Sequence, residues 1–122
     1  TIGVIAHGHN IIYPEKSRYL YKELEKRHLI ISEYVPTSPI RKYKFLERNR
    51  LVAGLTSSLL VTEAAKKSGT SRTVDFALDL GNNVFCLPGK FGAKMSWAMN
   101  EYIREGAILV NKLEDFGEEL GF

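Results

Sequence analysis

Apolar and polar positions alternate along the chain in blocks that have the lengths of strands and helices. Short apolar runs predict strands, and longer segments with apolar residues three or four positions apart predict helices between them. Glycine or proline follows several segments and marks their ends. Strands are expected at residues 1–6, 29–32, 57–62, 84–87 and 107–110, and helices at residues 15–27, 45–55, 71–80, 96–104 and from 113 onward.

This order of elements predicts an α/β fold in one domain spanning residues 1–122. Repeated alternation of strands and helices is typical of a mainly parallel sheet covered on both faces, a three-layer α/β/α sandwich. A length of 122 residues with 44% hydrophobic composition suits one compact core. Because the first strand has no polar residues ahead of it, we expect the sequence to begin inside a larger domain and to be N-terminally incomplete.

Charge is distributed unevenly along the chain. The overall formal charge of +3 and pI near 9.0 are common among proteins that bind no nucleic acid. Residues 15–50, however, contain ten Lys or Arg and five Glu, whereas residues 111–122 contain one Lys and four acids. The positive field is therefore expected in the N-terminal third, where it would favour a polyanionic ligand.

Cysteine usage and hydropathy indicate a cytoplasmic protein without a membrane segment. The single cysteine, Cys86, lies in an apolar run, which excludes an internal disulfide and predicts a buried thiol in a reducing compartment. No run approaches the roughly 18 apolar residues that span a bilayer, and the first residues lack the pattern of a signal peptide.

The densest chemical signal is the segment from Arg41 to Arg50, which holds five cations and two aromatic residues. Cations interleaved with aromatic side chains suit a single strand of DNA, which offers phosphates and unstacked bases. On a helix Lys44 and Arg48 share one face, and Phe45 and Asn49 form the adjacent pair. The alternative is a solvated, charged helix whose Phe45 faces the core.

A second candidate anion site is the loop Ser68-Gly69-Thr70, which opens a predicted helix. Free backbone amides at a helix N-terminus can hold a phosphate. An N-cap formed by Thr70 or Ser71 explains the same residues without a ligand.

Catalytic motifs are weak in this sequence. His7, His9 and His28 have no cysteine or carboxylate partner at metal-ligand spacing, and no nucleophile turn of the Gly-x-Ser-x-Gly type occurs. His7 and His9 flank Gly8 at the end of the first strand, where open parallel sheets place ligands, so they are candidates for lining a pocket. We therefore expect a binding protein with no catalytic residues, no metal and no cofactor.

The run Phe-Leu-Glu-Arg-Asn-Arg-Leu-Val-Ala-Gly-Leu at residues 45–55 resembles the signature Phe-Pro-x-Arg-Asn-Arg-Ile-Ile-Ala-Gly-Leu of the DprA/Smf family of DNA-processing proteins. Further similarities follow in the same order along nearly the whole chain. They lie at residues 12–14, 31–34, 63–64, 68–70, 84–89 and 103–107.

The resemblance implies a Rossmann-like fold, binding of single-stranded DNA without strong sequence preference, and loading of the RecA recombinase during natural transformation. The family's Lys-x-x-Phe ahead of Arg-Asn-Arg corresponds to Lys42 and Phe45, with Arg48 and Arg50 as cations facing the DNA backbone. Together with the segment itself, this predicts DNA contacts at Lys42, Lys44, Phe45, Arg48, Asn49 and Arg50. Self-association in this family implies a homodimer through the elements that contain Asn100, Ile103 and Leu109.

The sequence departs from the family at two loops and leaves two other functions open. The family's Ser-Gly-Ser-Leu-Ile-Thr is Ser-Gly-Thr-Ser-Arg-Thr at residues 68–73, and its Gly-Thr-Asn is Ala-Met-Asn at residues 98–100. One alternative is a nucleotide phosphoribohydrolase of the lysine-decarboxylase-like group. Its Pro-Gly-Gly-x-Gly-Thr loop and catalytic Glu are only faintly matched by Glu63 and Gly69-Thr70. The other alternative is a protein-interaction module whose contact with DNA is incidental.

Overall fold

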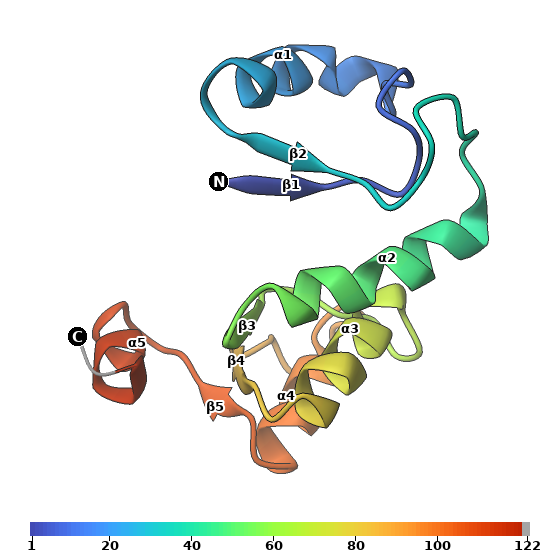
Figure 1. Cartoon of the computed structure of the whole chain (residues 1–122). Helices are drawn as coiled ribbons and strands as arrows, with labels where there is room; N and C mark the ends of the chain where they lie inside the picture. Colours follow the sequence, from blue (N-terminus) through green and yellow to red (C-terminus); the bar gives the residue numbers. More distant parts are fainter. Residues whose placement is uncertain (121–122) are drawn as a thin grey trace. The chain divides into compact units, whose positions relative to one another are not determined.

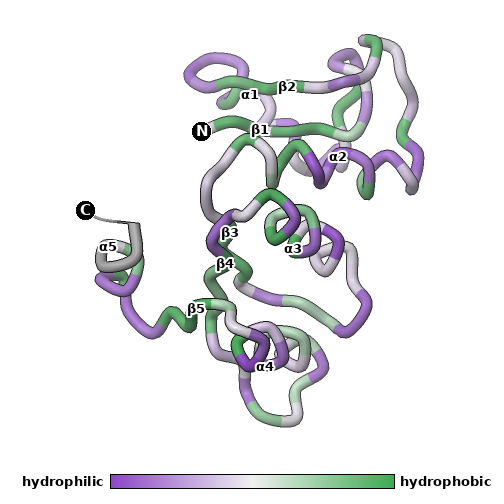
Figure 2. The backbone as a smooth tube through the Cα atoms, turned by 60° about the horizontal axis from the view of Figure 1, so that its bottom comes forward, coloured by the Kyte–Doolittle hydropathy of each residue, from purple (hydrophilic) through white to green (hydrophobic). Residues whose placement is uncertain are grey.

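The computed structural model of the chain describes residues 1–120 and contains two compact units, Thr1–Val52 and Ala53–Phe122. Each unit combines parallel strands with helices (Figure 1). The strands are hydrophobic along most of their length, whereas the helices carry mixed hydrophilic and hydrophobic stretches (Figure 2). The predicted alternation of strands and helices is therefore confirmed.

The first unit is a β-α-β arrangement followed by the start of a long helix. Strand β1 (Ile2–Val4) pairs in parallel with β2 (Leu29–Ile31), and η1 (Glu15–Ser17) and α1 (Arg18–Arg27) connect them. Helix α1 packs closely on β1, because a Cβ at Gly3 would lie 3.3 Å from Leu24 Cδ1. Helix α2 (Lys42–Gly54) then begins after the loop that follows β2.

The second unit has a three-stranded parallel sheet in the order β3-β4-β5. Leu59 of β3 lies opposite Val84 of β4, and Cys86 of β4 lies opposite Leu109 of β5. The elements are β3 (Ser58–Val61), α3 (Gly69–Asp79), β4 (Asn83–Cys86), α4 (Trp97–Arg104), β5 (Ile108–Leu109) and α5 (Glu114–Leu120).

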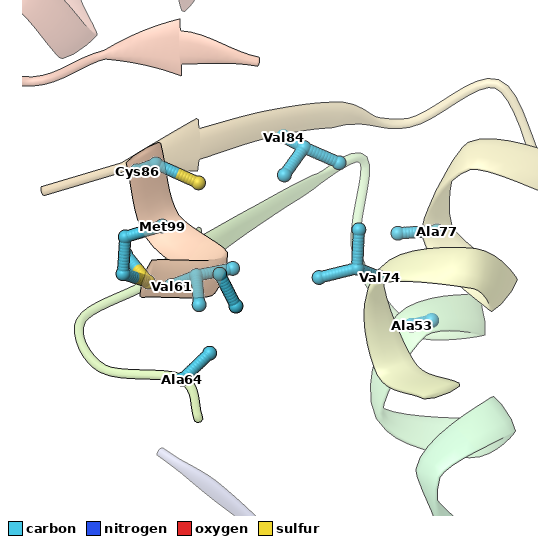
Figure 3. Close-up of a cluster of buried hydrophobic side chains, with 9 residues drawn as sticks. Ala53, Val61, Ala64, Val74, Ala77, Val84, Cys86 and Met99 are labelled. Atoms are coloured by element: carbon cyan, nitrogen blue, oxygen red, sulfur yellow. The ribbon is translucent and has the colours of Figure 1, made fainter. Parts of the chain in front are cut away.

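Side chains of helices pack on both faces of this second sheet. Val84 and Cys86 belong to a buried cluster with side chains of α3 and α4 (Figure 3). Phe85 points to the opposite face, as the two-residue period of a strand requires, and its ring centroid lies 5.1 Å from that of Phe116 in α5. Cys86 is fully buried as predicted, and burial raises the pKa of its thiol to about 11.

The boundaries of several elements differ from the predicted ones. Helix α2 begins at Lys42 instead of residue 45, and the amide of Lys44 donates to the carbonyl of Arg41 (3.1 Å) in its first turn. Helix α3 likewise begins two residues early, at Gly69. Within residues 1–120, no helix is long and apolar enough to cross a membrane, and no group of acidic, histidine or cysteine side chains is arranged to hold a metal ion.

Candidate nucleic-acid interface

In the first unit, the loop that follows β1 lies against the loop that follows β2. The amide of Gly8 donates to the carbonyl of Ser38 (2.9 Å), and the amide of Asn10 donates to the carbonyl of Pro36 (2.9 Å). A Cβ at Gly8 would lie only 2.1 Å from the Pro36 oxygen, so only glycine permits this approach. The two loops therefore form one fixed platform beside the start of α2.

His7 is buried beneath this platform and forms hydrogen bonds to the loop after β1 and to α1. The ring is 2% exposed, and Nδ1 lies 3.0 Å from the carbonyl of Gly8, which can only accept, so Nδ1 carries a proton. Nε2 lies 3.1 Å from the hydroxyl of Tyr21. His7 is thus a buried, hydrogen-bonded residue, whereas His9 is the exposed member of the pair.

Lys44 occupies a different environment from the one that its sequence pattern predicts. Its side chain is 5% exposed, and Nζ donates to Ser38 Oγ (2.6 Å) and to the carbonyl of Pro39 (2.7 Å). The ammonium also lies 4.6 Å from the centroid of the Tyr34 ring. Lys44 therefore connects α2 to the loop after β2, and its ammonium does not face solvent.

Arg48 is half-buried and also bonds within the protein. Its Nη1 donates to the carbonyl of Val4 at the end of β1, and its Nε donates to Asn49 Oδ1 (3.2 Å). Burial lowers the pKa of the guanidinium. The hydrogen bond to Val4 fixes α2 against β1. The Arg48 Cζ also lies 5.9 Å from the centroid of the Phe45 ring, so Arg48 contacts the aromatic residue one turn earlier in α2.

Two acidic residues hold further side chains of this region in place. Arg50 is exposed and forms an ion pair with Glu33. The hydroxyl of Tyr34 donates to Glu47 Oε2 (2.8 Å). Burial, together with this carboxylate, raises the pKa of Tyr34 to about 12. Of the residues predicted to touch DNA, Arg50 is thus exposed but already paired.

Arg41, Lys42 and Tyr43 are three consecutive exposed residues at the N-terminal end of α2. Phe45, one residue beyond Lys44, is half-buried and meets Tyr13 edge to face, with ring centroids 6.1 Å apart. Tyr13 is 47% exposed. We call this set the α2 surface: Tyr13, Arg41, Lys42, Tyr43 and Phe45.

Two of these five residues are among those that the sequence predicts to contact DNA. Lys42 and Phe45 were predicted, and Arg41 and Tyr43 stood in the same dense segment without being singled out. Tyr13 comes much earlier in the chain and is brought to Phe45 only by the fold. Its position within the family-like run at residues 12–14 was the one available signal.

The predicted anion loop lies in the second unit, at the start of α3. Ser68 is the N-cap residue, in place of Thr70 or Ser71, and its side chain makes no capping hydrogen bond. The Ser68 Oγ is buried and has no hydrogen-bond partner within the described part of the chain. An anion contact at Ser68, Gly69 and Thr70 stays a prediction.

The three residues expected in self-association have different environments. The side chain of Asn100 bonds to the backbone of Gly89, through the Gly89 amide (3.2 Å) and the Gly89 carbonyl (3.3 Å). Ile103 packs against the core of the second unit, and Leu109 is exposed on β5. Leu109 is therefore the member of this set that is most available to another molecule.

Comparison with known proteins identifies the family. The family model for DNA recombination-mediator protein A matches residues 1–121. The chain belongs to this family. DNA processing protein DprA of Bacillus subtilis is 36% identical over 98% of the chain and 40% of its own length, and Protein Smf of Escherichia coli is 38% identical over 100% and 33%. The chain thus spans less than half the length of these DprA/Smf relatives.

Solved structures of family members have the same fold. The X-ray structure of DprA from Streptococcus pneumoniae superposes with a TM-score of 0.94 at 36% identity, covering 98% of this chain and 42% of that one. DprA from Helicobacter pylori, described as binding single-stranded DNA in a unique mode, gives a TM-score of 0.90 at 29% identity over 98% and 55%. The DprA/Smf resemblance and the Rossmann-like α/β fold are therefore confirmed.

Proposed function

We propose that this chain binds single-stranded DNA through the α2 surface. The observation that carries the proposal is the exposure of Arg41 and Lys42 near the Tyr13–Phe45 aromatic pair, at the start of a helix that hydrogen bonds of Lys44 and Arg48 hold in place. Membership of the DprA/Smf family and the description of the Helicobacter pylori structure support the same ligand.

In this mechanism the exposed and the buried residues of the region have separate tasks. Arg41 and Lys42 contact phosphates, while the rings of Tyr13, Tyr43 and Phe45 offer surfaces on which bases stack. Lys44 and Arg48 keep α2 in position through the carbonyls of Pro39 and Val4. Contacts to the DNA phosphates and to the faces of the bases do not distinguish one base from another. Binding is therefore expected to depend little on the DNA sequence.

The test compares labelled oligo-dT with a duplex of equal length, by fluorescence anisotropy at two salt concentrations. We expect preference for the single strand, and weaker binding of the single strand by the variant Arg41→Glu/Lys42→Glu. Because this variant removes two cations that neutralise phosphates, the slope of log affinity against log salt should fall by about 1.4. The matched control Lys22→Glu/Lys26→Glu makes the same charge change at exposed positions of α1. Equal weakening by both variants would refute the assigned surface.

A role in recombination extends this proposal to a protein partner. We infer from family membership that the chain delivers single-stranded DNA to the RecA recombinase during natural transformation. RecA nucleation on DNA coated with a single-strand-binding protein tests this role. The chain should shorten the lag before filament growth, and Arg41→Glu/Lys42→Glu should not. An unchanged lag with the wild-type chain would contradict it.

Self-association is the remaining structural part of the proposal. We propose a homodimer in which the exposed Leu109 of β5 and the neighbouring helix α4 take part. Multi-angle light scattering should give twice the chain mass for the wild type and the chain mass for Leu109→Glu. A wild-type protein that stays monomeric at high concentration would exclude this dimer.

We also propose that the chain acts by binding and has no catalytic function. Assay of free-base release from nucleoside monophosphates tests the phosphoribohydrolase alternative. Release at the rate of a buffer blank is expected. Release that Glu63→Gln abolishes would establish an enzyme.

A further inference from the structure

The second unit carries another aromatic and cationic surface, between β4 and α4. Residues 90–94 and Trp97, together with Ala65 and Lys66, surround a cavity of about 690 Å³. This volume falls within the range of small-ligand sites, roughly 300–1,000 Å³. Phe91 lies at the edge of the cavity and is 98% exposed, and Trp97 is 47% exposed.

The loop that presents Phe91 is tied down at both ends. At its start, the amide and the carbonyl of Gly89 both bond to the side chain of Asn100 in α4 (3.2 and 3.3 Å). Near its end, the carbonyl of Met95 accepts from the amide of Ala64 (3.1 Å). A Cβ at Gly89 would lie 2.2 Å from Ser96 Cβ, so the two ends of the loop also touch. The anchored backbone therefore holds Phe91 out into solvent.

The charges around the cavity are almost all positive. The cavity is lined by Lys66, Lys90 and Lys94. Among the residues that the structure describes, one acidic residue, Glu101, also lines the cavity, and it forms an ion pair with Arg104 (2.6 Å). The Lys66 ammonium lies 4.3 Å from the centroid of the Trp97 ring, so one cation is held beside an aromatic face. A ligand complementary to this surface has negative charge and flat apolar faces.

We propose that this surface binds a second stretch of single-stranded DNA. We call it the Phe91 surface and define it by Lys66, Lys90, Phe91, Lys94 and Trp97. A base stacks on Phe91, and phosphates contact Lys90 and Lys94, which flank that ring in the sequence. The inference rests on the proposed function, because it assigns a further contact to the same ligand.

A second copy of the chain fits this surface less well. Two identical Phe91 surfaces facing one another would bring three lysines of each copy together, and like charges in an interface oppose association. A polyanion instead neutralises these lysines and covers the exposed ring. Charge complementarity therefore favours single-stranded nucleic acid over self-association.

The chain contains its own probe for this site, because Trp97 is its single tryptophan. Titration with unlabelled oligo-dT should change Trp97 fluorescence with the same midpoint as the anisotropy of labelled oligo-dT. Phe91→Ala should weaken oligo-dT binding roughly 5- to 150-fold, the range for loss of one stacked base, and Phe91→Tyr should restore it. Because Phe91 is fully solvated, these variants should keep the circular dichroism spectrum of the wild type.

The matched control is Tyr19→Ala, which removes a 70% exposed aromatic ring from α1. It should bind oligo-dT like the wild type. A second variant, Lys90→Glu/Lys94→Glu, should lower the salt slope by about 1.4, because it too removes two cations that neutralise phosphates.

The outcomes separate this inference from the proposed function. If Phe91→Ala and the lysine variant bind like the wild type while Arg41→Glu/Lys42→Glu does not, the Phe91 surface is no DNA site and the α2 surface stands. If the wild-type chain binds no oligo-dT, both proposals fail. If Phe91→Ala dissociates a dimer without changing DNA affinity per chain, the surface is a self-association site and the inference is wrong.

Discussion

At the scale of single residues, two lysines in the first turn of α2 have opposite roles. Lys42 is exposed and belongs to the α2 surface, whereas Lys44 is buried with its ammonium bonded to Ser38 and Pro39. A buried charge is tolerated when its hydrogen bonds are satisfied, and removing it leaves the partner groups unsatisfied. Stability and DNA affinity should therefore respond to different lysines.

Substitution of Lys44 tests this division. Lys44→Ala should lower the free energy of unfolding by about 1.5–3 kcal/mol, because it removes the hydrogen bonds that a charged donor makes to Ser38 Oγ and to the Pro39 carbonyl. Urea denaturation measures the change. Lys42→Ala is the matched control and should leave the unfolding midpoint in place while it reduces the salt slope of DNA binding by about 0.7. The reverse pattern would show that Lys44 is the DNA contact.

Cys86 allows a second test at this scale, through its chemical reactivity. Burial raises its thiol pKa from 9.0 to about 11, so at pH 8 the thiolate population is about 100-fold below that of a free thiol. Reaction of the native chain with Ellman's reagent should therefore be slow at pH 8, and complete within mixing time in urea. Since Cys86 is the single cysteine, one equivalent of product reports this site alone. Rapid reaction of the native protein would contradict the buried position.

At the scale of elements, the period of apolar residues predicted where strands and helices lie but not where they end. Every predicted segment has a counterpart in the structure, whereas α2 and α3 begin two or three residues earlier than predicted. The first turn of α2 is polar, so periodicity carries no signal there. Its start depends on the bonds of Lys44 to the preceding loop, which join residues that have no common pattern in the sequence.

The candidate site was predicted in the same partial way. Local composition found the dense segment at residues 41–50, because cations and aromatic residues are visible in the sequence. Composition does not show which cations turn inward, and Arg48 bonds to Val4, a residue of β1. The Tyr13–Phe45 pair and the Phe91 surface depend on tertiary contacts and on an anchored loop, so they became visible only in the folded chain.

Gly8 gives a prediction for the loop platform beside α2. A methyl group at this position would overlap the Pro36 carbonyl, so Gly8→Ala must separate the loops after β1 and β2. We expect a loss of about 1–3 kcal/mol in unfolding free energy, the usual cost of overpacking, together with weaker oligo-dT binding. Gly54→Ala is the control, because its Cβ would meet nothing closer than 3.9 Å. Thermal unfolding followed by circular dichroism distinguishes the two variants.

At the scale of the whole molecule, the α2 surface and the Phe91 surface belong to different compact units of the chain. Each combines cations with exposed aromatic rings, and each is held by hydrogen bonds between a helix and a neighbouring loop. A DNA strand that binds both surfaces has phosphates neutralised and bases stacked at two positions along its length. An oligonucleotide that is too short to reach both surfaces can instead bind to either of them separately.

The length of the oligonucleotide should therefore change the stoichiometry of binding. A tetranucleotide of dT, about the smallest site size of a single-strand-binding fold, should bind twice per wild-type chain. It should bind once to Phe91→Ala and once to Arg41→Glu/Lys42→Glu, and isothermal titration calorimetry counts these equivalents directly.

A long oligo-dT should instead bind once per chain, and the combined variant should lose affinity by the product of the two single losses, because separate sites contribute additive free energies. Wild-type binding of one tetranucleotide, unchanged by Phe91→Ala, would show that a single surface carries the DNA. A combined loss no larger than either single loss would mean instead that the two surfaces act as one coupled site.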